Sequence, residues 1–189
     1  MKQVSDADFG CRKCGKAVTL EQFKSSRFCP NCGTMLRPLR CWIFQFNPAV
    51  YLWHDWIKEN GEGKYEQWLV SQHAREIHKG DRVAIWASGE RAGIYALGEI
   101  LEEPRIKALR LEQQKYWIKK EDIKKFEEKK STMVRYLKLI IDNPLLEEAC
   151  RKDHLLKNME ILKHSQGTNF YLGKEHWKRI VNLTSENTV

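Results

Sequence analysis

The chain has 189 residues, of which 42% are hydrophobic and 31% are charged, and it contains seven Trp. This composition excludes a disordered chain and suits one ordinary globular domain accompanied by a small module. No apolar run approaches the roughly 18 residues that cross a bilayer. Residues 1–9 also lack the apolar core of a signal peptide, so we expect an intracellular, cytoplasmic protein without a membrane partner.

The positive charge is concentrated near the N-terminus. Residues 1–40 hold eight Lys or Arg and three Asp or Glu, so +5 of the net charge of +8 lies there. Such a surface would neutralise phosphates and release counterions, which favours nucleic acid as the partner. A solvated surface without a binding role is the alternative. The residues predicted to contact the backbone are Lys2, Arg12, Lys13, Lys16, Lys24, Arg27, Arg37 and Arg40.

Two short motifs in this segment carry the most specific chemistry of the chain. They are Cys11-Arg12-Lys13-Cys14-Gly15 and Cys29-Pro30-Asn31-Cys32-Gly33. Each C-x-x-C-G motif places two thiolates on one tight turn, although the spacer between the motifs is slightly short. The pattern predicts a zinc ribbon with one structural Zn²⁺, because four sulfur ligands leave no open position for catalysis. The predicted ligands are Cys11, Cys14, Cys29 and Cys32.

Other roles for the cysteines stay open at this point. A disulfide framework is the main alternative, but a chain without an export signal is expected in a reducing compartment, where paired motifs more often bind metal. Redox catalysis is a further alternative. Cys41 and Cys150 stand alone and are predicted to be small buried apolar residues. We expect the metal to supply the folding energy of a segment this short.

The main domain follows the connection at 37–40, and its elements can be predicted in chain order. The apolar, aromatic run at 41–46 is typical of a central strand. Asn47 is placed to cap a helix that begins at Pro48 and continues to Lys58. The further predictions are a strand over 66–70, a helical turn over 71–78, an edge of the sheet over 106–118, a strand over 132–141, and helices over 121–130, 145–150, 154–161 and 174–183.

The stretch from Gly80 to Ile100 predicts an antiparallel hairpin with a turn at 88–91. Its first strand alternates, so that Trp86 and Ser88 share one face. Small residues leave space beside the indole, which suits either a flat ligand or close packing of backbones. Trp86 is therefore predicted to be a ligand-stacking residue, with a core role as the alternative.

Motifs for catalysis are missing from the sequence. Ser88 does not lie in a G-x-S-x-G elbow, and neither a phosphate-binding glycine loop nor an H-E-x-x-H helix is present. The pair His54-Asp55 lacks a second group of metal ligands and is predicted to lie on the surface of the first helix. We therefore expect a protein that is not an enzyme.

Several motifs together resemble one known family. W-I-F-Q-F-N-P at 42–48, G-D-R-V-A-I-W-A-S-G at 80–89 and A-G-I-Y-A-L-G at 92–98 resemble the EVE domain. The segment Q-G-T-N-F at 166–170, followed by Trp177, resembles its closing strand and helix. The resemblance spans 41–183. It implies an α+β fold, a PUA-like curved β-barrel with surrounding helices that is similar to YTH domains. The predicted organisation is a zinc ribbon and linker over 1–40 and an EVE domain over 41–189.

The resemblance also implies that a modified base, flipped out of a duplex or already single-stranded, enters an aromatic pocket. Trp86 is the expected stacking wall, and Ser88 and Gly89 would contact the base edge. Asn47 and Thr168 are further polar candidates, with a helix cap and a plain turn as their alternatives. The remaining candidates are the aromatic residues Trp42, Tyr51 and Tyr95, which could equally belong to the core.

Three functions follow as hypotheses. The first is a non-catalytic reader of a modified base in DNA, expected to be a modified cytosine, whose basic zinc ribbon docks on the backbone or on a partner. The second is a reader of modified RNA, because PUA-like folds imply RNA as readily. The third is a zinc-ribbon interaction adaptor. Some EVE domains are joined to nuclease modules, so a nuclease in modification-dependent restriction would be a fitting partner.

Overall fold

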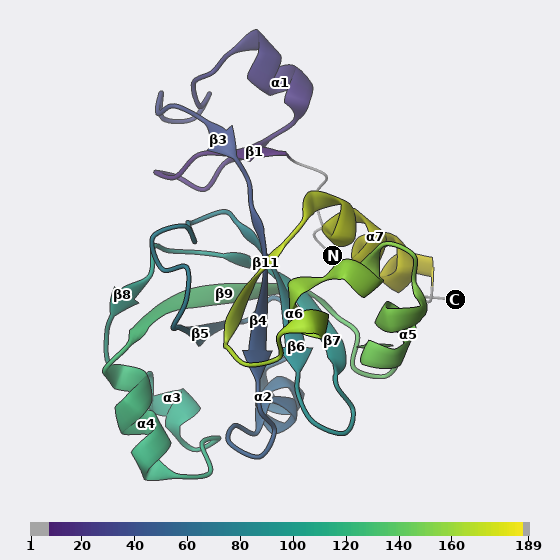
Figure 1. Cartoon of the computed structure of the whole chain (residues 1–189). Coiled ribbons are helices and arrows are strands. Elements are labelled where there is room, and N and C mark those ends of the chain that lie inside the picture. The colour runs from purple at the N-terminus through teal and green to yellow at the C-terminus, as the bar shows by residue number, and fades with distance from the viewer. Residues whose placement is uncertain (1–7, 187–189) are drawn as a thin grey trace.

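The computed structural model of the chain describes residues 8–186, which form a small N-terminal module and one large curled sheet with helices around it (Figure 1). The N-terminal module, residues 8–40, contains the three-stranded sheet β2-β1-β3. Its elements are β1 (Phe9–Gly10), β2 (Ala17–Val18), α1 (Leu20–Ser25) and β3 (Arg37–Pro38). Lys2 lies outside the described residues.

The large sheet has eight strands, in the order β11-β4-β6-β7-β9-β5, with β10 beside β7 and β8 beside β9. Strands β4 and β6 are parallel, from Cys41 opposite Arg82 to Phe46 opposite Ala87. The other pairs are antiparallel. The strands are β4 (Cys41–Phe46), β5 (Tyr65–Val70), β6 (Arg82–Ala87), β7 (Gly93–Ile100), β8 (Arg105–Ile106), β9 (Lys130–Leu139), β10 (Leu145–Leu146) and β11 (Asn169–Leu172).

The helices gather in separate places around this sheet. Figure 1 shows α5, α6 and α7 on one side of the sheet, whereas α3 and α4 lie near the end farthest from the N-terminal module. No helix among residues 8–186 is both long and apolar enough to cross a membrane. The helices are α2 (Trp53–Asn60), α3 (Leu111–Gln114), α4 (Lys120–Glu127), α5 (Glu147–Lys152), the 3₁₀ helix η1 (Leu156–Asn158), α6 (Glu160–Lys163) and α7 (Lys174–Glu186).

Both faces of the central strands are buried, in two different hydrophobic clusters. Along β4, Trp42, Phe44 and Phe46 join the cluster inside the curl of the sheet. The alternate residues Cys41 and Ile43 join the outer cluster, which includes residues of α5, α6 and α7. Burial on both faces explains why this strand is a continuous apolar run.

The sheet curls until its two edge strands approach each other at one end. The carboxamide of Asn169, at the start of β11, joins them: its Nδ2 donates to Leu69 O at 2.9 Å, and its Oδ1 accepts from Ser71 N at 2.9 Å. Asn169 is buried, so these bonds take the place of ladder hydrogen bonds that the edges would otherwise lack. The fold is a curled half-barrel with surrounding helices, which confirms the predicted PUA-like α+β class.

Two of the predicted elements differ from the structure. The helix predicted from Pro48 begins only at Trp53, because Asn47 Oδ1 accepts from Ala49 N at 2.9 Å and holds the preceding residues in a local turn. Within the sheet edge predicted over 106–118, Leu111–Gln114 form the helix α3 instead. There Gln113 bonds both backbone groups of Gln67, with Oε1 2.7 Å from Gln67 N and Nε2 3.1 Å from Gln67 O, so a side chain covers the β5 edge.

Candidate functional site

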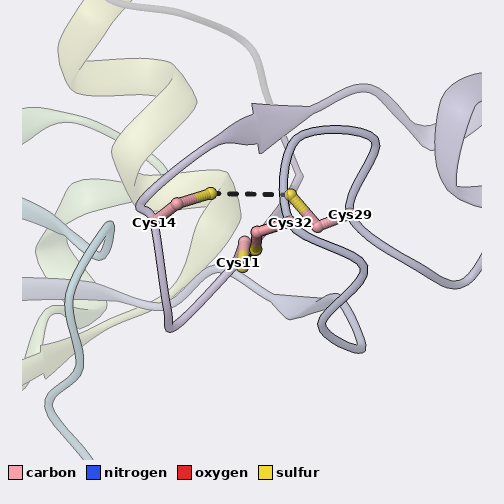
Figure 2. A group of neighbouring side chains, drawn as sticks. All are labelled: Cys11, Cys14, Cys29 and Cys32. Carbon is pink, nitrogen blue, oxygen red and sulfur yellow. Dashed lines mark hydrogen bonds between the residues drawn. The ribbon is translucent and has the colours of Figure 1, made fainter.

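The four cysteines of the paired motifs come together in the N-terminal module, as Figure 2 shows. Their sulfur atoms all lie within 4.8 Å of one another. Cys11 Sγ is 3.4 Å from Cys32 Sγ, and Cys14 Sγ is 3.5 Å from Cys29 Sγ. Tetrahedral zinc with bonds of about 2.3 Å requires sulfurs roughly 3.8 Å apart, so the four side chains are placed to hold a metal ion such as zinc.

The two motifs repeat the same backbone geometry. Gly15 N donates to Cys11 O at 2.8 Å, and Gly33 N donates to Cys29 O at 2.9 Å. Both glycines have positive φ, 76° and 68°, a conformation that side chains disfavour. Hydrogen bonds with the side chain and the backbone of Thr34 lower the pKa of Cys32 to about 6, whereas burial raises the pKa of Cys29 to about 11.

The module is joined to the large sheet through a buried carboxylate. Asp81 has no exposed surface and forms an ion pair with Arg37 at 2.7 Å. Its oxygens also accept from Arg40 N at 3.0 Å, Trp42 Nε1 at 3.0 Å and His78 N at 2.9 Å. Arg37 was predicted to contact nucleic acid, but this ion pair and its burial give it a structural role instead.

The remaining predicted cations of the module differ from Arg37 in exposure. Arg40 pairs with the exposed Glu76 at 2.9 Å, and Arg27 lies over the Phe23 ring at 4.3 Å. Side chains that are exposed and show no ion pair in the described part of the chain are Arg12, Lys13, Lys16, Lys24 and Arg27. They lie at the end of the molecule opposite the tips of β4 and the β6–β7 hairpin (Figure 1).

A cavity of about 190 Å³ lies where β4 ends, and we call it the aromatic cavity. Its position between β4, β5 and α4 places it at the end away from the cysteines. Rings dominate its wall, with Tyr51 and Trp117 5.2 Å apart and Trp117 and Phe126 5.4 Å apart between centroids. The lining includes the aromatic residues Phe46, Tyr51, Trp68, Trp117 and Phe126 and the polar residues Gln45, Asn47, Gln67 and Thr168.

Only some of the polar groups of this cavity have hydrogen-bond partners. Gln45 Nε2 donates to Gly167 O at 3.0 Å, and Thr168 Oγ1 is bonded to Gln72 and Asn169. Trp117 Nε1 is different, because it is buried and finds no acceptor among the described residues. Asn47 Nδ2 also has no partner in that part of the chain, while Asn47 Oδ1 is held by Ala49 N. Both groups without a partner are hydrogen-bond donors, of which the Trp117 N–H is buried whereas Asn47 is exposed.

Beneath the aromatic cavity lies a buried glutamate. Glu66 is fully buried and accepts hydrogen bonds from the hydroxyls of Tyr51 and Tyr136. Burial raises its pKa to about 7, while hydrogen bonds from Tyr136 and Tyr51 oppose the shift. The indole N–H groups of Trp53 and Trp68 donate to Tyr136 at 2.8 and 2.9 Å. Tyr51 thus lines the cavity, while its hydroxyl donates a hydrogen bond to Glu66.

A second cavity, about 650 Å³, lies beside the turn of the β6–β7 hairpin, and we call it the hairpin cavity. Ser88, Gly89, Tyr95 and Asn47 line it, as do His54 and Lys58 of α2. Ser88 N and Oγ both donate to Phe46 O, at 2.9 and 3.1 Å. The Tyr95 hydroxyl donates to Arg91 O at 2.8 Å, which fixes the turn.

The predicted pocket residues therefore fall into four groups. Ser88, Gly89 and Tyr95 line the hairpin cavity, Tyr51 and Thr168 line the aromatic cavity, and Asn47 lines both. Trp42 and Trp86 line neither of them.

Trp42 and Trp86 belong to the hydrophobic clusters, which corrects the expected stacking wall. Trp86 is only 2% exposed and lies in the outer cluster, so a base has no access to its indole in this structure. Trp42 has no exposed surface and donates its Nε1 to Asp81.

Sequence reasoning missed Trp68, Trp117 and Phe126 as cavity residues. Trp117 was assigned to the sheet edge at 106–118, a segment that instead forms α3 and a bridge between Tyr51 and Trp117. The local signal was the adjacent aromatic pair Tyr116 and Trp117 in an otherwise polar segment. Its relation to β4 comes from tertiary structure, which spacing along the chain does not reveal.

Comparison with known families agrees with this architecture. Residues 40–183 match the family model described as EVE domain. Because this match spans most of the chain, the protein belongs to the EVE domain family. The N-terminal cysteines lie outside the matched residues. A search of curated proteins gave no match.

Solved structures share the fold at low identity. A protein from Leishmania major has 17% identity and a TM-score of 0.59, with 80% of this chain and 98% of the other covered. Rpa0253 from Rhodopseudomonas palustris has 16% identity and a TM-score of 0.57, with 80% and 97% covered. Human THYN1, solved in complex with DNA containing 5-methylcytosine, has 15% identity and a TM-score of 0.56, with 77% and 97% covered.

Proposed function

We propose that the chain is a non-catalytic reader that binds one modified base, a modified cytosine in DNA, in the aromatic cavity. The observation that carries the proposal is the buried, unpartnered Nε1–H of Trp117 in a wall made of aromatic rings. A buried donor without a partner is costly, and an acceptor on a bound base would satisfy it. THYN1, which has the same fold, binds DNA that contains 5-methylcytosine, and this supports DNA as the polymer.

The unused donors favour cytosine among the pyrimidines. Cytosine carries two adjacent acceptors, N3 and O2, which would accept from Trp117 Nε1 and Asn47 Nδ2. The base would leave the duplex and stack on the rings of Tyr51 or Trp117, an interaction that contributes about 1–3 kcal/mol. A cavity of about 190 Å³ is small beside the roughly 300–1,000 Å³ of drug-sized sites, which suits a single heterocycle.

The modification itself would be recognised by burial. A methyl group contributes about 0.8 kcal/mol when it is buried, which corresponds to a selectivity of about fourfold over the unmodified base. Larger selectivity would require that the modification also displace a polar group.

We further propose that Cys11, Cys14, Cys29 and Cys32 bind one structural Zn²⁺ in an intracellular, cytoplasmic protein. The metal would hold the two motifs together and would take no part in chemistry. In this proposal residues 1–40 form the ribbon with its linker, and residues 41–189 form the EVE domain.

In this proposal the ribbon contacts DNA away from the base. Strand β4 has six residues, so at about 3.3 Å per residue it separates the two ends by roughly 20 Å. This corresponds to about six nucleotides along one strand at 3.4 Å each. We propose that the exposed cations from Arg12 to Arg27 contact phosphates at that distance.

The experiment that tests the base site is equilibrium binding to matched duplexes with cytosine or 5-methylcytosine at one position. Trp117→Phe keeps a ring but removes the N–H, and we expect about a fivefold loss of affinity for the modified duplex, because a hydrogen bond contributes about 1 kcal/mol. The matched control is Trp56→Phe, a buried tryptophan of the inner cluster that lines neither cavity.

The proposal fails if Trp117→Phe and Trp56→Phe bind the modified duplex equally well while both remain folded. The same measurement with RNA of equal sequence decides the polymer. Tighter binding to modified RNA than to modified DNA would replace DNA by RNA in the proposal.

A further inference from the structure

The two cavities at the end of β4 are separated by a single short loop. Asn47 lines both of them, Pro48 and Ala49 line the hairpin cavity, and Val50 and Tyr51 line the aromatic cavity. The loop is held in place, because Val50 N and Tyr51 N both donate to Asn47 O, at 2.9 and 3.0 Å. Whatever occupies the hairpin cavity therefore lies next to whatever occupies the aromatic cavity.

The charged groups of the hairpin cavity are mainly basic. Lys58 is exposed, and its nearest carboxylate is Asp55 at 3.8 Å. Arg91 is exposed and forms no ion pair within residues 8–186. His54 is partly buried, and its pKa is lowered first by burial and then by the charge of Lys58, with a smaller effect of Arg91. Glu90 is the carboxylate in the lining and opposes these cations.

The turn of the hairpin adds backbone donors. Gly89 has a φ of 95° and open space on the side where a Cβ would stand. Ala92 N donates to Gly89 O at 3.1 Å, which closes the turn. The N–H groups of residues 89–91 have no acceptor within the described range, so they are free to bind an anion.

We propose that the hairpin cavity binds a phosphodiester of the nucleic acid, the one beside the base held in the aromatic cavity. The inference rests on the proposed function, because it places base and backbone of one strand on opposite sides of the 47–51 loop. Lys58 and Arg91 supply charge, and the hairpin turn supplies backbone N–H groups. The backbone contact nearest the base is thereby assigned to the cavity end of the molecule and not to the N-terminal module.

A base is a less suitable occupant of this cavity than a phosphate. The rings of His54 and Tyr95 meet edge to face, with centroids 5.1 Å apart and planes at 69°, which leaves no parallel slot between them. The cavity is also larger, at about 650 Å³ against 190 Å³, and it carries the cations that the aromatic cavity lacks.

The test is the salt dependence of binding to a duplex with one 5-methylcytosine and to its unmodified counterpart. We expect Arg91→Gln combined with Lys58→Gln to lower the slope of log affinity against log salt by about 0.9, the contribution of one neutralised phosphate. The ratio of affinities for the two duplexes should stay unchanged. Glu90→Gln should act in the opposite direction and strengthen binding to both duplexes.

The matched control is Lys178→Gln, which removes an exposed cation of α7 far from either cavity. The inference is overturned if the slope of the double variant equals that of Lys178→Gln. If the native chain does not distinguish the two duplexes, the proposed base site fails, while the slopes still decide the phosphate site. Absence of binding to either duplex would overturn both proposals.

Discussion

The two ends of the molecule are stabilised by different interactions. The N-terminal module has a buried cluster of only four residues, Cys11, Val18, Cys29 and Leu36, and its Arg37 forms an ion pair with the buried Asp81. The cavity end rests on a large inner cluster of aromatic and aliphatic side chains. A large core can hold donors such as Trp117 Nε1 unpaired, whereas a small module must use its polar groups to fold.

Removal of the metal should have the largest effect and should separate the two ends. Structural zinc supplies about 10–16 kcal/mol in small zinc-binding peptides, so a chelator should unfold the N-terminal module, residues 8–40, and leave the large sheet folded. Amide NMR spectra would show lost dispersion for the module and unchanged signals for β4, β6 and β7. Cys14→Ser should reproduce the loss, whereas Cys150→Ala should leave the module folded. Unfolding of both ends by the chelator would contradict the conclusion that they are stabilised by different interactions.

The connection between the ends should be the next most sensitive feature. Asp81→Asn leaves Arg37 buried beside a neutral group, and breaking a buried pair of this kind costs about 3–5 kcal/mol. Urea unfolding measures the change. Glu76→Gln is the control, because it removes the exposed partner of Arg40 in the same region and should cost about 0–1 kcal/mol. Equal costs for the two variants would show that burial does not govern this connection.

The stability of the cavity end should depend on pH because Glu66 is buried there. Its pKa is about 7 in the folded chain against an ordinary 4.5, so the folded chain binds this proton more tightly than the unfolded chain does. Tighter proton binding by Glu66 adds to the free energy of unfolding. This contribution is fully present below about pH 4.5 and is lost as pH rises through about 7, a change on the order of 3 kcal/mol.

Glu66→Gln should remove this dependence. The measurement is the free energy of unfolding at pH 5 and pH 8, with the exposed Glu128→Gln as the control. A variant with the same pH dependence as the native chain would show that Glu66 does not titrate in this range.

Local patterns in the sequence predicted much of this structure. The spacing of Cys11, Cys14, Cys29 and Cys32 predicted that the four side chains lie close together, and they do, because each pair lies on one turn. The hairpin of β6 and β7 also followed from alternation and turn residues. The identity of the metal stays a prediction.

The choice of cavity residues depended on contacts that local patterns do not contain. Alternation along β6 separated Trp86 from Val83 and Ile85, but it could not show that the outer face is covered by helices far along the chain. Trp117 reaches the cavity only because α3 and the Tyr51–Trp117 bridge bring it beside β4. Its free N–H is a property of the folded chain alone.

The most direct measurement is the NMR spectrum of the indole N–H groups during titration with a duplex that carries one 5-methylcytosine. The Trp117→Phe variant assigns its signal among the seven tryptophans. We predict that the Trp117 signal shifts and becomes protected from exchange with water, while the signals of Trp42 and Trp86 stay unchanged. A shift of Trp86 with no change at Trp117 would contradict the account and restore the hairpin indole as the base-binding wall.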